Sequence, residues 1–102
     1  MNKYLLHGKL TASRDNSGQL ISILIEASKL VSIAKGCNLY LISKDANDKD
    51  AVWITEVWDS KQDHDNSLHA EGVKELISRA IPLLGEQPQK GQELEVLGGT
   101  GL

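Results

Sequence analysis

A histidine and a serine stand three residues apart, just after a strand-like segment that ends in a tryptophan. His64 and Ser67 belong to a polar stretch with the character of a helix start, and Trp58 precedes it. Residues three apart on a helix point to the same side, so the imidazole and the hydroxyl would face together. An imidazole with a pKa of about 6.5 can accept a proton at neutral pH, and an indole can stack on a flat ring. These residue types indicate a pocket for an aromatic ligand with a base beside it.

Each of these residues also has an ordinary structural alternative. A tryptophan at a strand end is commonly a core side chain, and a helix histidine can make a single structural hydrogen bond. A serine near a helix end commonly bonds back to the main chain, which is the alternative for Ser67. Asp65 follows His64 directly, but it lies about 100° away around a helix. We therefore do not expect Asp65 to orient the imidazole.

Further pocket candidates come from the other aromatic residues and from the strands. An aromatic pocket can draw only on four residues, Tyr4, Tyr40, Trp53 and Trp58. Glu56 shares a strand face with Trp58, two residues on. It either pairs structurally or lines the cavity, and we expect the structural role. His7 lies on one face of its strand, and Leu6 and Leu10 lie on the other. The face with His7 could border the sheet's far side or the helix layer.

Motifs for a metal or a cofactor are missing from the sequence. The three histidines and the single Cys37 show neither CxxC nor HExxH spacing. His64 and His69 are five residues apart, which does not place both rings on one helix face. The glycines from Gly98 to Gly101 precede no helix, unlike a dinucleotide-binding loop. We expect neither a metal nor a cofactor.

Strand-like and helix-like periodicities alternate along the chain and must position these candidates. Strand-like segments are 4–12, 37–43, 51–58 and 92–97. Helix-like segments are 20–34, 60–68 and one that starts at about Glu71, is disturbed by Pro82 and ends at Gly85. Gly36 is the predicted C′ residue of the first helix. The order predicts an α+β, ferredoxin-like βαββαβ fold with an antiparallel sheet. We expect one domain over 1–97 and a flexible tail over 98–102.

The segment 51–58 is apolar on both faces, which indicates that both faces of the sheet are covered. Trp53 and Val57 fall on one face, and Val52, Ile54 and Trp58 on the other. A sheet with one solvated face alternates apolar and polar residues more cleanly. Helices would cover one face, and the sheet of a second subunit would cover the other. A chain of 102 residues has a modest core, so we expect a homodimer.

Composition excludes several classes of partner. The net charge is −3 and no cluster of lysine and arginine occurs, so we expect no nucleic-acid partner. No stretch approaches the roughly 20 apolar residues of a membrane span, so we expect no membrane partner. The single cysteine suits a reducing compartment, and we expect a cytoplasmic location.

The run from Val52 to Leu84 resembles the antibiotic biosynthesis monooxygenase family of small dimeric α+β-barrel proteins. The residues that carry the resemblance to its quinol monooxygenase branch are Glu56-Val57-Trp58-Asp59-Ser60 and His64-Asp65-Asn66-Ser67-Leu68. The resemblance implies a cofactor-free oxygenase that acts on a quinol-like or polyphenolic aromatic with O₂. Without a cofactor the substrate itself must reduce O₂, and a phenol does so better as its anion. His64 would then be the base, Trp58 the wall that holds the ring, and Ser67 the group that positions an oxygen, while His7, Tyr4 or Tyr40 would complete the cavity.

Two other functions use the same features. An isomerase or lyase would need the base and the pocket but no O₂, and a non-catalytic dimer would only bind a small molecule. Heme degradation, which one branch of the family carries out, is not expected. That branch has an asparagine on the first strand and a histidine ten residues after the tryptophan, whereas this chain has Gly8 and Leu68 at those places.

Overall fold

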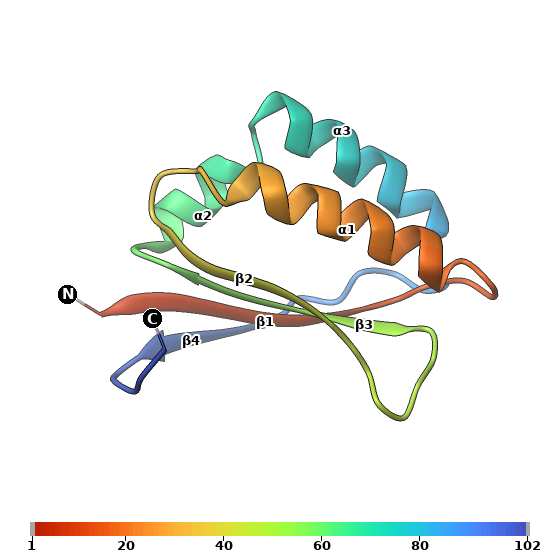
Figure 1. Ribbon diagram of the computed structural model, residues 1–102, viewed down its shortest axis with the longest axis horizontal. Coiled ribbons are helices and arrows are strands. Elements are labelled where there is room, and N and C mark those ends of the chain that lie inside the picture. Colours follow the sequence, from red (N-terminus) through yellow and green to blue (C-terminus); the bar gives the residue numbers. More distant parts are fainter. Residues whose placement is uncertain (1, 102) are drawn as a thin grey trace.

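Four strands form one antiparallel sheet, and the helices lie against a single face of it (Figure 1). The computed structural model describes residues 2–101, so Met1 and Leu102 lie outside the described residues. The elements in chain order are β1 (Lys3–Thr11), α1 (Ser17–Val31), β2 (Cys37–Lys44), β3 (Ala51–Trp58), α2 (Lys61–Ser67), α3 (Glu71–Ala80), the short 3₁₀ helix η1 (Ile81–Leu83) and β4 (Gln92–Val96). The strand order is β2-β3-β1-β4 with antiparallel neighbours. This confirms the predicted ferredoxin-like α+β fold.

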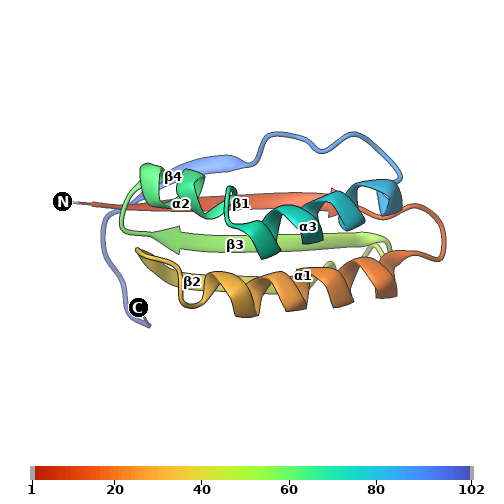
Figure 2. The same cartoon turned by 90° about the horizontal axis from the view of Figure 1, so that it is seen from above.

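The register of the sheet decides which side chains face the helices. Tyr4 on β1 lies opposite Trp58 on β3, and Glu56 on β3 lies between Leu6 on β1 and Tyr40 on β2. Side chains alternate between the faces of a sheet, so these five residues share one face. Seen from above, α1 runs over β2, and α3 runs over β3 and β1 (Figure 2). The face with Glu56 and Trp58 is the one that the helices cover.

The core between helices and sheet consists of two adjoining clusters. The larger one gathers apolar side chains of α1, β3 and α3 around the fully buried Leu20 and Val52. The smaller one is formed by Val31, Trp58 and Val73, near the end of β3. Full burial of one such side chain contributes about 1.5–3 kcal/mol. The buried residues of α1 recur at the helical spacing that predicted the helix.

The first helix is shorter than its apolar periodicity predicts. α1 ends at Val31 instead of continuing to Ala34, so Gly36 is not its C′ residue. The Ala34 N–H donates to the Val31 carbonyl at 2.9 Å, which forms a tight turn in place of the helical ladder. The Ser32 hydroxyl also donates to the main chain, at the Lys29 carbonyl. These local bonds compete with helix continuation.

Replacing Gly36 should destabilise the turn that places α2. Gly36 has φ +83°, where a residue with a Cβ loses roughly 1–2 kcal/mol. A Cβ there would also collide with Asp63, the neighbour of His64 on α2. We expect Gly36→Ala to lower the free energy of unfolding in urea by at least that amount. Gly18→Ala is the control. Gly18 lies on α1, and a Cβ added there would have no neighbour within 4 Å. It should stabilise the protein by up to about 1 kcal/mol; equal unfolding midpoints for the two variants would contradict this account.

The opposite face of the sheet carries no helix among the described residues (Figure 1). Leu41 and Leu94 lie on it and are 50% and 51% exposed. The alternation of β3 places Trp53 and Val57 there as well, as predicted. Val57 is buried even in the isolated chain, whereas Leu41 and Leu94 leave part of this apolar face open to solvent.

The C-terminal residues follow β4 without forming a helix or a strand over 97–101. The domain over 1–97 and the flexible tail over 98–102 stay predictions, and Met1 and Leu102 lie outside the described residues. Within residues 2–101, the helices are all too short or too polar to cross a membrane.

Candidate active site

A cavity of about 270 Å³ lies between the helices and the sheet. Its wall is formed by apolar side chains of α1, α3 and the sheet, with three polar residues among them, Tyr40, Glu56 and Ser67. A larger hollow of about 500 Å³ lies at the surface near the N-terminus. Four of its charged side chains are already paired with one another, in Lys3–Asp59 and Lys61–Glu93. The first cavity therefore has the character of a ligand site, since it is concave, apolar and supplied with few polar groups.

Glu56 is the charged residue of the cavity wall. It is buried on β3, and its Oε1 accepts a hydrogen bond from Trp58 Nε1 at 3.0 Å. The same oxygen lies 3.7 Å from His64 Nε2. Burial raises the pKa of the Glu56 carboxyl, while the Trp58 hydrogen bond and the nearby His64 charge oppose that rise. A buried carboxyl with a raised pKa is a candidate for proton transfer.

His64 is buried directly behind Glu56. Ser60 caps α2 by accepting the Asp63 N–H at 3.1 Å, as the sequence predicts, and His64 lies in the last turn of this short helix. The imidazole packs edge-on against Trp58 at 5.9 Å between ring centroids and at 5.7 Å from the Tyr4 ring. Glu56, and not His64, borders the cavity.

The prediction that Asp65 does not orient the imidazole is wrong. Asp65 Oδ1 lies 2.9 Å from His64 Nδ1. The difference of about 100° between adjacent helix positions is bridged by rotation about the side-chain bonds of both residues. The Asp65 side chain is 46% exposed, whereas that of His64 is 11% exposed. His64 thus stands between a buried carboxylate, Glu56, and one in contact with solvent.

Ser67 and Trp58 occupy different places relative to the cavity. The Ser67 hydroxyl lines the cavity, but it donates its proton to the His64 carbonyl at 2.6 Å. Its lone pairs are what it can offer to a ligand. Trp58 is 0% exposed and packs in the smaller core cluster behind Glu56, where its indole N–H holds the carboxylate. The cavity wall beside it is made by Glu56 and Tyr40.

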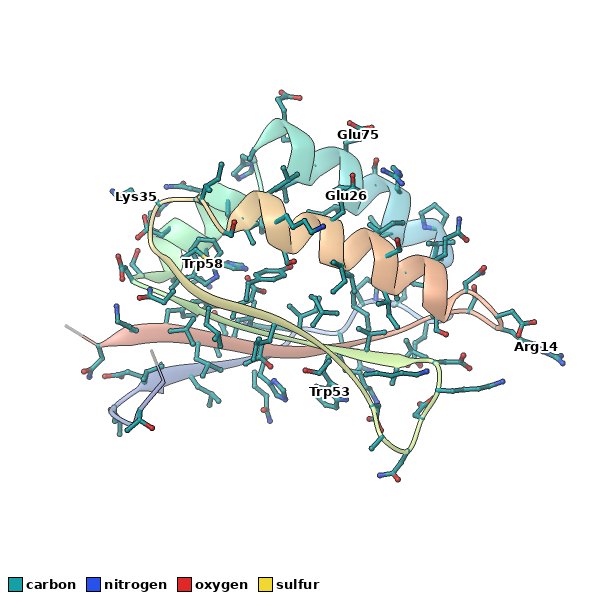
Figure 3. The ribbon with its side chains drawn as sticks, in the orientation of Figure 1. Arg14, Glu26, Lys35, Trp53, Trp58 and Glu75 are labelled. Atoms are coloured by element: carbon teal, nitrogen blue, oxygen red, sulfur yellow. The ribbon has the colours of Figure 1, made fainter. Side chains whose placement is uncertain are left out.

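The remaining predicted residues are divided between the two faces of the sheet. Tyr40 lines the cavity, and burial raises the pKa of its hydroxyl. Tyr4 packs beside His64, and its hydroxyl donates to Glu93 at 2.9 Å. His7 lies on the open face, where its ring stacks on Trp53 at 4.7 Å and Nδ1 is 2.9 Å from the Thr55 hydroxyl. Figure 3 shows Trp58 on the helix side of the sheet and Trp53 on the other side.

Glu93 on β4 connects the start of α2 to β1. Its Oε2 accepts from Tyr4 and from Lys61 Nζ, both at 2.9 Å. These hydrogen bonds, with that of Lys61 the largest cause, lower the pKa of Glu93 to about 2. The contact helps to hold Tyr4, and with it the ring of His64, in place.

Two residues, Glu56 and Asp65, take a larger part in this arrangement than the sequence indicates. We expect a structural role for Glu56, and it has one as the acceptor for Trp58, but it is also the charged residue among the three polar residues of the cavity wall. The useful signal was its position two residues before Trp58, because a buried indole N–H needs an acceptor on its own face. The pairing of Asp65 with His64 depends on side-chain rotation, for which the sequence carried no signal. Among residues 2–101, no three histidine, cysteine or acidic side chains converge as a metal site requires.

Comparison with known proteins places the chain in a family. The sequence profile of the family described as "Antibiotic biosynthesis monooxygenase" matches residues 4–79. No curated protein sequence matches this chain significantly. Among solved structures, a candidate antibiotic biosynthesis monooxygenase from Chloroflexus aurantiacus J-10-fl is 37% identical, with 97% of each chain covered and a TM-score of 0.87.

More distant structures share the same fold. A candidate antibiotic biosynthesis monooxygenase from Nitrosomonas europaea is 14% identical, with 97% of this chain and 94% of that chain covered and a TM-score of 0.90. One from Deinococcus radiodurans is 25% identical, with 97% and 95% covered and a TM-score of 0.74. The profile match spans most of the chain, and the Chloroflexus protein is similar over nearly all of it. The chain therefore belongs to the antibiotic biosynthesis monooxygenase family.

Proposed function

We propose that this protein is a cofactor-independent monooxygenase that oxidises a quinol-like or polyphenolic aromatic with O₂. The observation that carries the proposal is Glu56, a buried carboxyl at the polar end of an otherwise apolar cavity, backed by His64. An aromatic ring would lie in the apolar part with a hydroxyl directed at Glu56. The monooxygenase names of the related structures support the reaction class.

The reaction begins with removal of the phenolic proton by Glu56. The phenolate transfers one electron to O₂, and the resulting phenoxyl radical and superoxide combine to form a carbon–oxygen bond at a ring carbon that carries hydrogen. Loss of water from this hydroperoxide leaves a quinone. For a hydroquinone, one atom of O₂ becomes the added oxygen of a hydroxyquinone. The other atom leaves as water, with one phenolic hydrogen and the hydrogen of the attacked ring carbon. The substrate supplies all four electrons that reduce O₂.

His64 would pass the proton from Glu56 to solvent. A carboxylate beside Nδ1 favours the tautomer with its proton there, which leaves the Nε2 lone pair facing Glu56. The 3.7 Å between Nε2 and Glu56 Oε1 exceeds a hydrogen bond, and such distances commonly shorten when substrate binds. Asp65, which is half-exposed, would pass the proton from His64 to solvent. Tyr40 and Ser67 would contact the substrate oxygen, Tyr40 as donor and Ser67 as acceptor.

Oxygen uptake with a panel of reduced quinones and polyphenols tests the proposal. Wild-type protein should consume O₂ faster than a protein-free blank, which corrects for autoxidation of the compounds. Proton transfer by a positioned side chain contributes about 10²–10⁴ in rate. His64→Ala removes the group that takes the proton from Glu56, so activity should fall on that scale. His69→Ala is the matched control, because His69 is exposed after α2 and does not line the cavity.

The other outcomes point to the alternative functions. Uptake equal to the blank for every compound would refute the monooxygenase. Turnover under strict anaerobiosis would then indicate an isomerase or lyase, and binding without turnover would indicate a non-catalytic module.

We also propose that the protein is a homodimer whose open sheet faces pack together. The half-exposed Leu41 and Leu94 on that face support it, because sheets commonly pack face to face. We expect Leu41→Lys to convert a dimer to a monomer in sedimentation at micromolar concentration. Ile33→Lys is the control. Ile33 is highly exposed beyond the end of α1, so this variant should stay dimeric. A monomeric wild type would contradict the proposal.

A cytoplasmic location, suggested by the single Cys37, is likewise a proposal.

A further inference from the structure

We infer that the substrate is an amphiphilic phenol, with its polar groups at one end and an apolar tail at the other. The inference rests on the proposed function for the identity of the head group. Its evidence is the distribution of polarity in the cavity. Tyr40 and Glu56 are cross-strand neighbours, and Ser67 ends α2 nearby. The rest of the wall is apolar.

The cavity extends along α1 beyond its polar end. Val31 packs near Trp58 at that end, whereas Ile23, in the middle of α1, belongs to the larger cluster. Both line the cavity. The eight helical steps from Ile23 to Val31 correspond to about 12 Å. Ala80 and Leu84, which lie in or against the larger cluster, complete the apolar end.

The apolar wall continues to the surface. Leu68, Ile77 and Ile81 line the cavity and are also among the exposed large hydrophobic residues, Ile81 at 56%. Ile77 and Ile81 are four residues apart across the end of α3, so they lie on one side of it. Exposed apolar residues that continue into a groove are typical of ligand-binding surfaces. They offer an apolar tail a path into the cavity.

A second polar group held in the apolar end, inside the opening at Ile77 and Ile81, would be unfavourable. It would lose its water and meet only apolar side chains there, and a buried hydroxyl without a partner weakens binding by roughly tenfold or more. Each added methylene of a tail, in contrast, should tighten binding about fourfold until the cavity is filled. The cavity thus selects for a tail and against a polyhydroxylated ligand of the same size.

Calorimetric titration of the intact protein with 4-alkylphenols, in the absence of O₂, tests the inference. From ethyl to butyl to hexyl, Kd should fall about fourfold per methylene. A hexylphenol with a terminal hydroxyl should bind at least tenfold more weakly than hexylphenol. Ala80→Leu should reduce the tail length at which Kd stops falling. Ala46→Leu is the matched control in the exposed β2–β3 loop, and it should follow the wild-type series.

The results separate this inference from the proposed function. A Kd that is independent of tail length, or unaffected by the terminal hydroxyl, would overturn the inference even if the protein oxidises short phenols. A tail-dependent Kd in a protein that consumes no O₂ would support the inference and refute the monooxygenase. If Ala80→Leu does not fold, as judged by circular dichroism, the wild-type series and the terminal hydroxyl still decide.

Discussion

Glu56→Gln should reduce protein-dependent oxygen uptake by about 10²–10⁴-fold, the scale of general-base catalysis. The amide has the shape of the carboxyl, and its oxygen can still accept the Trp58 Nε1 hydrogen bond. What it loses is the ability to take a proton from a substrate hydroxyl. The control is Glu75→Gln on the outer side of α3 (Figure 3), where the side chain is exposed. Full activity of Glu56→Gln would exclude Glu56 as the base.

The same substitution should stabilise the protein at neutral pH. Burial raises the pKa of Glu56 above its ordinary value of 4.5. At a pH between the ordinary pKa and the raised pKa of the folded protein, Glu56 has lost its proton in the unfolded chain but keeps it in the folded protein. The contribution of Glu56 to stability is therefore highest below pH 4.5 and declines as pH rises through the folded pKa. Glutamine removes this decline.

Thermal unfolding as a function of pH measures the difference. The Tm of Glu56→Gln should rise relative to wild type between acidic and neutral pH, and each 1 kcal/mol should appear as about 4–8 °C. Parallel curves for the two proteins would mean that burial does not perturb Glu56. Together with the loss of activity, a higher Tm at neutral pH would identify Glu56 as a residue kept for function at a cost in stability.

Trp58→Ala should lower the free energy of unfolding by about 3–5 kcal/mol, the usual range for a buried aromatic residue. Trp58 is fully buried and is the largest member of the cluster with Val31 and Val73. Domains of this size have only about 5–15 kcal/mol in total. Urea unfolding followed by circular dichroism gives the value. A loss below 1 kcal/mol would mean that the cluster repacks around the missing ring.

Trp58→Phe separates packing from the hydrogen bond to Glu56. Phenylalanine keeps most of the apolar bulk, so the loss of stability should be smaller than for alanine. The Glu56 carboxylate loses its indole donor, which opposes the rise in its pKa. The pH at which activity appears should therefore move upward in Trp58→Phe. An unchanged pH profile would show that the hydrogen bond does not tune Glu56.

The order of elements could be predicted from the sequence because it depends on local periodicity. The β-branched and aromatic run over 51–58 and the helical spacing from Val73 to Ala80 are properties of neighbouring residues, and the structure has β3 and α3 there. α3 ends at Ala80, and only the short 3₁₀ helix η1 follows it before Gly85. The end of α1 could not be predicted so well. The apolar spacing runs on to Ala34, but the side-chain bond of Ser32 and the turn at Val31 end the helix first.

The candidate site was predicted in part for the same reason. Trp58 and His64 are close in sequence, so a strand that runs into a helix brings their rings to 5.9 Å. His7 is distant from both, and alternation alone could not assign it to either face of the sheet. The register with β3 places its side chain beside Thr55, on the side away from the helices.

By itself the sequence determined the βαββαβ order and the neighbourhood of Trp58 and His64, because both arise from short-range spacing. Only the tertiary structure decided that Glu56 meets the cavity while Trp58 and His64 stand behind it. That outcome depends on which sheet face α1 and α3 cover and on how side chains from β2, β3 and α2 rotate against one another. These are contacts between residues far apart in the chain, and local spacing carries no information about them.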